Sequence, residues 1–113
     1  MADLTTTKIS VATGLVDVAA AATAANAGGD TALVGPNRFL YVNNGSGSSV
    51  TVTLTTPGTV SGLAIADPTY AVAAGKHAII PLTNVFRGAL GRVAVAYSAA
   101  TSVTVRPFEL ATS

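Results

Sequence analysis

The stretch NNGSGSSVTVTLTTPG, residues 43–58, decides the fold class of this chain. From Val50 to Leu54 every second residue is apolar, and the residues between are threonines. Because successive side chains of a β-strand point to opposite faces, this alternation predicts a strand with one buried face and one solvent-facing face. The Gly/Ser/Asn cluster before it and Pro57-Gly58 after it predict turns at both ends.

The same pattern of short apolar runs bounded by turn residues recurs from residue 38 onward. We predict further strands at 38–43, 59–65, 70–73, 77–82, 92–97 and 102–106. Residues 43–49 are predicted to form a hairpin loop that joins the first of these strands to 50–55. The strand at 38–43 is apolar on both faces, as expected for a central strand that is covered twice. Pro107 is expected to end the last pairing or to lie on a sheet edge.

These elements predict an all-β fold, a single antiparallel β-sandwich or jelly-roll-like barrel with an extended N-terminal arm. Residues 1–13 are polar with isolated apolar positions and form the arm, which we expect to become ordered on a neighbouring molecule. Residues 14–113 form the single β domain. The alanine-rich residues 16–27 suit either a helix or an extended segment, and we favour the extended form because one helix fits poorly beside so many strands.

The composition excludes several classes of function. The chain has 113 residues, which suits one domain, and it has no cysteine for a disulfide or a thiolate metal site. Its net charge of +1 gives no electrostatic reason to bind nucleic acid or an anionic membrane. Although 50% of the residues are hydrophobic, no run approaches the length of a spanning helix, and the N-terminus lacks the features of a signal peptide. Only 10% of the residues are charged, which suggests that neighbouring molecules cover much of the surface.

The residues that carry chemistry are few and scattered. His77 is the only histidine, and no nucleophile motif or nearby acid accompanies it, so we expect no catalytic site. The five acidic residues are separated from one another, so we expect no metal ion and no cofactor. Gly45-Ser46-Gly47 precedes a strand and lacks the following Lys-Thr of a phosphate loop. Aromatic residues occur about one per strand, which favours a core over a sugar-stacking platform.

The motifs TPGTVSGLAIAD at 56–67, VAAG at 72–75 and GRVAVAYSAATSVTV at 91–105 follow a strand that ends in Asn-Gly and a V-T-V-T run. Over about residues 14–110 this order resembles a family of small proteins encoded in the structural modules of tailed bacteriophages, often beside the major capsid protein. Two segments depart from the family pattern. VGPNRFLYVNNG replaces an Asp-Gly-Arg-Thr turn, and NVFRGALGR replaces a proline-rich loop.

The resemblance implies a virion structural protein, most similar to a capsid decoration (cement) protein. Such a protein is made in the host cytoplasm, binds the exterior of the major capsid protein shell and bridges capsomers as a homo-oligomer, with a trimer favoured. The N-terminal arm and the loops at 43–49 and 84–91 would then contact partners. The candidate interface residues are Leu4, Ile9, Val11, Asn44, Ser46, Phe86, Arg87, Leu90 and Arg92. The alternatives are another virion component (tail, head–tail connector or fibre-like) or a carbohydrate-binding module.

Overall fold

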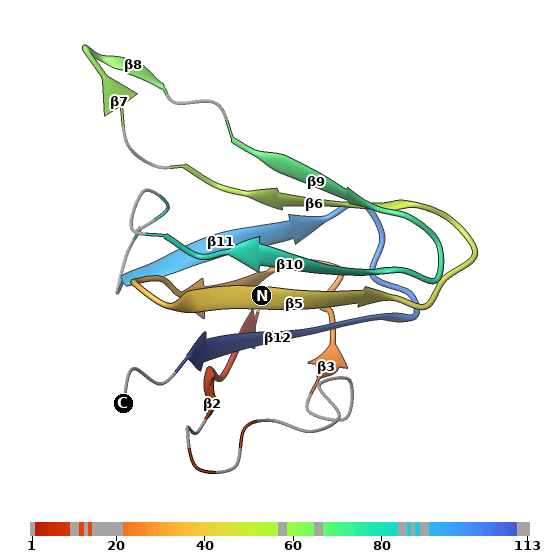
Figure 1. The fold of residues 1–113 in the computed structure, drawn as a ribbon. Coiled ribbons are helices and arrows are strands. Elements are labelled where there is room, and N and C mark those ends of the chain that lie inside the picture. The colour runs from red at the N-terminus through yellow and green to blue at the C-terminus, as the bar shows by residue number, and fades with distance from the viewer. Residues whose placement is uncertain are drawn as a thin grey trace.

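The computed structural model describes residues 2–9, 12, 14, 22–56, 59–64, 67–83, 86, 88 and 91–110. Two β-sheets pack face to face, as Figure 1 shows, and none of the described residues lies in an α-helix. The predicted all-β sandwich is therefore confirmed. In the alanine-rich stretch, the described residues 22–27 contain a short strand and the start of a turn, and residues 16–21 lie outside the described part.

Sheet A has the strand order β1-β4-β11-β6-β9, and sheet B has the order β10-β5-β12-β2, with β3 also pairing with β12. The small hairpin β7-β8 stands apart from both. Pairing is antiparallel except for β1 with β4 and β2 with β12. The strands are β1 (Ala2–Asp3), β2 (Thr7–Ile9), β3 (Thr23–Ala24), β4 (Asp30–Leu33), β5 (Arg38–Asn44), β6 (Val50–Leu54), β7 (Thr59–Val60), β8 (Leu63–Ala64), β9 (Thr69–Val72), β10 (His77–Pro81), β11 (Arg92–Tyr97) and β12 (Val103–Leu110).

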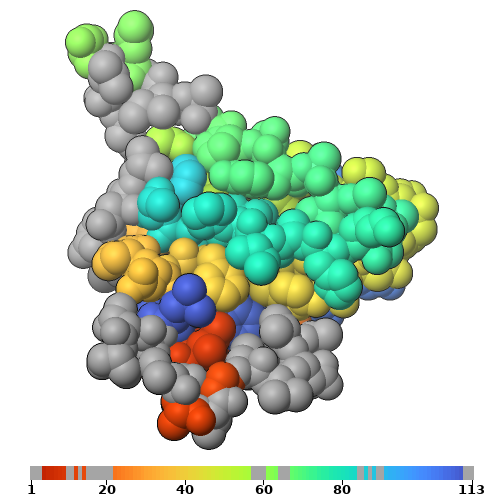
Figure 2. Space-filling model, viewed as in Figure 1, coloured from red at the N-terminus to blue at the C-terminus, as the bar shows by residue number. Residues whose placement is uncertain are grey.

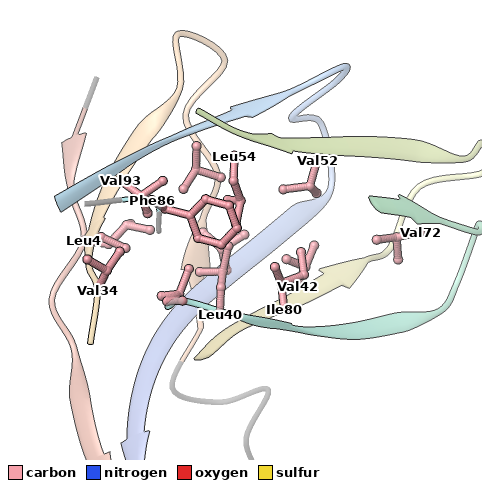
Figure 3. Packing of buried hydrophobic residues seen from close by; sticks show 14 of the residues in the cluster. Leu4, Val34, Leu40, Val42, Val52, Leu54, Val72, Ile80, Phe86 and Val93 are labelled. Carbon is pink, nitrogen blue, oxygen red and sulfur yellow. The ribbon is translucent and has the colours of Figure 1, made fainter. Parts of the chain in front are cut away.

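Strand β6 has the predicted two-faced character. Val50, Val52 and Leu54 are almost fully buried, and the threonines between them are half-buried. The inward faces of both sheets interlock around these residues, and Figure 3 shows the ring of Phe86 in the middle of the cluster. The buried cluster consists of Leu4, Ala32, Val34, Leu40, Val42, Val50, Val52, Leu54, Val72, Ile80, Leu82, Phe86, Val93, Val95, Val103 and Val105.

The prediction that residues 43–49 close a hairpin is wrong. β5 belongs to sheet B and β6 to sheet A, so the loop between them crosses from one sheet to the other. The turns from β9 to β10 and from β11 to β12 cross in the same way. A Gly/Ser/Asn cluster marks where the chain reverses, but it does not specify whether the two strands pair or face each other across a core.

The predicted strand at 59–65 is instead the hairpin β7-β8. Ser61 and Gly62 connect its strands with φ angles of 52° and 79°. Two consecutive residues with positive φ are the signature of a type I′ turn, whose twist suits a two-residue hairpin loop. The hairpin projects away from the sandwich in Figure 1, and Leu63 on it is 74% exposed.

Pro107 does not end β12, which continues to Leu110. In the pairing with β5, the bonds Gly45 N–H to Ser102 O and Leu110 N–H to Asn37 O show that even-numbered residues of β12 face β5. The nitrogen of Pro107 therefore faces the opposite edge. No described strand pairs with β12 at this point, because β3 pairs at 104–105 and β2 at 108–110. The missing N–H of the proline costs no ladder hydrogen bond there.

The N-terminal segment is extended, as predicted, but its described residues lie along the chain's own sheets. β1 adds to the edge of sheet A, and β2 adds to β12 in sheet B. Between them Leu4 enters the core with 6% exposure, and its N–H donates to Thr31 O. Arg92 fixes the place where the N-terminal segment passes from sheet A to sheet B, since its Nη1 donates a hydrogen bond to Leu4 O at 3.2 Å. Residues 2–9 thus close one side of the sandwich.

Candidate interaction surface

The two outward faces of the sandwich differ in chemistry. Strand register and alternation assign the outward residues of sheet A, which are small or polar apart from one leucine and one arginine. Because most of these side chains are threonine or alanine, this face offers little apolar surface to a partner. Its residues are Thr31, Leu33, Thr51, Thr53, Thr69, Ala71, Arg92, Ala94 and Ala96.

The outward face of sheet B, by contrast, is mostly aromatic and aliphatic. Figure 2 views the molecule from this side, with β10, β5 and β12 at the front. We call this surface the outer B face. It consists of Thr7, Ile9, Phe39, Tyr41, Asn43, His77, Ile79, Pro81, Thr104, Arg106, Phe108 and Leu110. The two-sided apolar pattern of 38–43 is thereby explained, because the central strand β5 carries Leu40 and Val42 inward and Phe39 and Tyr41 outward.

An aromatic cluster stiffens the centre of the outer B face. Phe108 is fully buried, with ring centroids 5.7 Å from Phe39 and 6.5 Å from Tyr41. The ring of His77 stacks on Tyr41 at 5.6 Å, and a hydrogen bond joins its Nδ1 to the Tyr41 hydroxyl. Offset and edge-on aromatic contacts of this kind stabilise a fixed arrangement of rings. Phe108 and Tyr41 are themselves almost fully covered, so the cluster supports the face rigidly and the exposed apolar groups lie around it.

The geometry of the aromatic cluster also bears on whether this face could bind sugars or whether His77 could act in catalysis. A sugar-stacking platform needs coplanar, exposed rings, but here Tyr41 is 6% exposed and the Phe39 and Phe108 planes differ by 34°. General-base catalysis by His77 needs an orienting acid and a nucleophile. Among the described residues, the hydrogen bond and the ring contact of His77 are both with Tyr41, which gives this imidazole a packing role.

Exposed aliphatic groups lie on both sides of the aromatic cluster. Ile79 on β10 is 67% exposed, and Leu110 at the end of β12 is 48% exposed. Among the described side chains of this face, the one permanently charged group is Arg106, whose Nε donates to Thr7 Oγ1 at 2.7 Å. A nearly uncharged, rigid, apolar surface of this kind is typical of a protein contact site.

Three of the predicted interface residues lie inside the subunit. Leu4 is 6% exposed, Phe86 is 7% exposed and Asn44 is fully buried. Their side chains offer almost no surface to a partner in this conformation, which differs from the prediction. The reason is that the loop composition around them resembles a contact site, while the burial comes from long-range packing that the local sequence does not display.

Asn44 acts as an internal clamp for the loop that crosses between the sheets. Its Nδ2 donates to Ser48 O and to Val72 O, both at 2.8 Å. Its Oδ1 accepts from the N–H of Ser46 at 3.0 Å and from the Ser46 hydroxyl at 2.6 Å. The two predicted contact residues Asn44 and Ser46 are thus brought together, with a structural role inside the loop. Gly45 is required beside them, because a Cβ there would lie 2.9 Å from Ser102 O.

The remaining predicted residues are dispersed. Ile9 is half-buried on the outer B face, where it lies in register with Leu110. Arg92, the first residue of the central strand β11 of sheet A, holds the N-terminal segment through a hydrogen bond to Leu4 O. Val11, Arg87 and Leu90 lie outside the described residues. Sequence reasoning missed Ile79, whose signal was an apolar residue at an outward position of the predicted strand 77–82, and Leu110, which lies beyond the predicted strand 102–106.

A second polar cluster lies between the start of β4 and the end of β11. Asp30 is fully buried, and its Oδ2 accepts from the Tyr97 hydroxyl at 2.8 Å and from the Asn26 N–H at 3.2 Å. Burial raises the pKa of the Tyr97 phenol far above its ordinary value, and the hydrogen bond to Asp30 raises it further. A hollow of about 590 Å³ beside it is lined by Leu4, Thr23, Asn26, Asp30 and Arg106, among others. The carboxylate here fixes the turn before β4 and the inward face of β11.

Within the described ranges, no group of three His, Cys, Asp or Glu residues could hold a metal ion. The described part of the chain also contains no helix with the length and hydropathy needed to cross a membrane. No family model, curated protein or solved structure matches this sequence.

Proposed function

We propose that this chain is a bacteriophage capsid decoration protein, which binds the outside of the major capsid shell and stabilises it by bridging capsomers. The observation that carries the proposal is the outer B face, a rigid apolar sheet surface in a chain with 10% charged residues. The resemblance of residues 56–67, 72–75 and 91–105 to phage structural proteins supplies the kind of partner. The proposal needs no catalytic residue and no cofactor.

The contrast between the two outward faces favours docking through sheet B. Burial of apolar surface stabilises an interface by about 25 cal/mol per Å² removed from water. Ile79 and Leu110 have large exposed apolar side chains, whereas the exposed positions of sheet A include Thr69 and Ala71. The outer B face therefore gains more from contact with an apolar partner than sheet A does.

The small size of the face supports an arrangement in which each subunit contacts more than one partner. Four strands spaced about 4.8 Å apart and about five residues long at 3.4 Å each span roughly 19 by 17 Å. A standard stable interface buries about 800 Å² on each partner, which exceeds what such a patch supplies alone. Contact with two capsomers at once raises the effective affinity without any stronger single contact.

The proposal is tested by binding to particles that lack the protein. Replacing Ile79 and Leu110 with lysine together is expected to abolish co-sedimentation with such particles, because two charges would be desolvated. The matched control replaces Thr69 and Ala71 with lysine, which adds the same charge at exposed positions on sheet A and should leave binding intact. Equal binding by both variants, with both folded, contradicts docking through the outer B face.

The copy number in purified virions separates the alternatives. A decoration protein is expected in hundreds of copies, whereas about six or twelve copies would indicate a connector. A tail or fibre-like role would place the chain away from the shell. A carbohydrate-binding module would give hits on a glycan array. The angles between the ring planes of the aromatic cluster do not favour sugar stacking, so we expect no hits.

A further inference from the structure

One edge of sheet B, strand β10, carries a second feature in its backbone, while its side chains His77, Ile79 and Pro81 belong to the outer B face. β10 pairs with β5 on one side and with no described strand on the other. The bonds Asn44 N–H to Lys76 O and Leu82 N–H to Arg38 O show that even-numbered residues of β10 face β5. The backbone groups of the odd-numbered residues therefore point away from the sheet.

These outward-pointing groups form a short, regular pattern. His77 and Ile79 each present an N–H and a C=O, and Pro81 presents a C=O without an N–H. All three residues are exposed, and within the described part of the chain no backbone hydrogen bond engages these groups. A row of free donors and acceptors on an exposed edge is a template for another strand.

The usual protection of such an edge is weak in β10. Edge strands are commonly blunted by charged side chains, by bulges or by proline. Strand β10 has no charged side chain that is permanently ionised, and its single proline is at its last position. Strand β9, one of the edges of sheet A, is also exposed at Thr69 and Ala71, but neither position carries a large apolar side chain such as Ile79.

We propose that β10 pairs with β10 of a second copy of this chain, antiparallel and two-fold symmetric about Ile79. The two Ile79 residues exchange both backbone hydrogen bonds at the centre. Each His77 N–H donates to the C=O of Pro81 in the other copy, so the missing N–H of the proline falls at the end of the ladder. Sheet B thereby continues across the axis, and the two exposed Ile79 side chains meet on one face.

Charge is compatible with this occupant, whereas the size of the contact limits its affinity. In the antiparallel register, Lys76 lies opposite Leu82 of the other copy and not opposite its own equivalent, so the two copies do not repel. Two five-residue edges bury less than the roughly 1,000 Å² that a stable complex needs. The pairing is therefore weak in dilute solution and becomes populated where many copies are held close together, so the test must trap it.

The absence of cysteine makes cross-linking a clean probe. A disulfide needs Cα atoms about 4.4–6.8 Å apart, and a hydrogen-bonded pair at the axis has about 5.5 Å. Under mild oxidation of concentrated protein, Ile79→Cys is expected to give mostly covalent dimer. His77→Cys alone should remain monomeric, because the two equivalent positions would be about 14 Å apart, four residues along the strand. Ala71→Cys on β9 is the exposed control from the other edge.

A mixture of His77→Cys and Pro81→Cys chains tests the register, since these positions face each other in the proposed pairing. The expected result is a mixed disulfide dimer, together with the Ile79→Cys dimer. The proposal is overturned if neither dimer exceeds that of Ala71→Cys, or if His77→Cys alone dimerises as readily as Ile79→Cys. The experiment uses the purified chain without capsids, so its outcome is independent of the decoration function.

Discussion

Replacing Asn44 with alanine separates an internal role for this residue from a contact role. The side chain is fully buried and takes part in hydrogen bonds to Ser46, Ser48 and Val72. Each lost bond costs about 0.5–1.5 kcal/mol, and a buried partner left unsatisfied costs more. We therefore expect Asn44→Ala to lower the free energy of unfolding by about 3 kcal/mol, a large part of the 5–15 kcal/mol typical of a domain.

For a domain of this size, such a loss lowers the melting temperature by about 12 °C, at roughly 4 °C per kcal/mol. Thermal unfolding followed by circular dichroism measures the shift. The matched control is Asn43→Ala, because Asn43 is the neighbouring asparagine, half-buried on the outer B face. If Asn44→Ala keeps the wild-type melting temperature but loses binding to particles, the internal role is refuted and the contact role predicted from sequence is correct.

Three further substitutions test other parts of the fold. Leu4→Ala should destabilise the chain by about 2–4 kcal/mol in chemical denaturation, because the side chain is in the core, and no change would indicate a free arm. Gly45→Ala should cost about 2 kcal/mol, since a backbone oxygen lies 2.9 Å from the added Cβ, whereas Gly47→Ala, with nothing within 4 Å, should cost much less. Burial and the bond to Asp30 raise the pKa of Tyr97, so the native state keeps a proton that the unfolded state loses above about pH 10. Stability should therefore fall as pH rises beyond 10, and less steeply in Tyr97→Phe; equal slopes in a pH series of unfolding curves would refute the assignment.

Strands β5, β6, β9, β10 and β11 could be predicted because their signals are local, whereas the 59–65 stretch was not recognised as a hairpin and β12 runs past its predicted end. Alternation at Val50–Leu54 is visible within five residues, and the turn residues on either side mark the ends. The pairing could not be predicted in the same way. Whether β5 and β6 share a sheet depends on which faces bury the most apolar surface, which is a property of the whole core. The hairpin interpretation of 43–49 failed for this reason.

The N-terminal third and the interaction surface were harder for related physical reasons. β4 contains Asp30, which the local sequence suggests is a turn residue. Its role becomes clear only from the hydrogen bond that the hydroxyl of Tyr97, on β11, donates to its carboxylate. Strands β1, β2 and β3 have two or three residues each and depend on the edges that they join. The outer B face combines residues from four strands, so no contiguous stretch displays it. The two-sided apolar pattern of residues 38–43 was its one local signal.

The most direct test of the account is a cryo-electron microscopy map of the intact particle at a resolution that shows strands. A decoration protein that docks through the outer B face should appear in many copies on the shell exterior, with β10, β5, β12 and β2 against capsomers and the threonine-rich sheet toward solvent. A map in which the shell carries no copies, or in which the outer B face points into solvent, would contradict it.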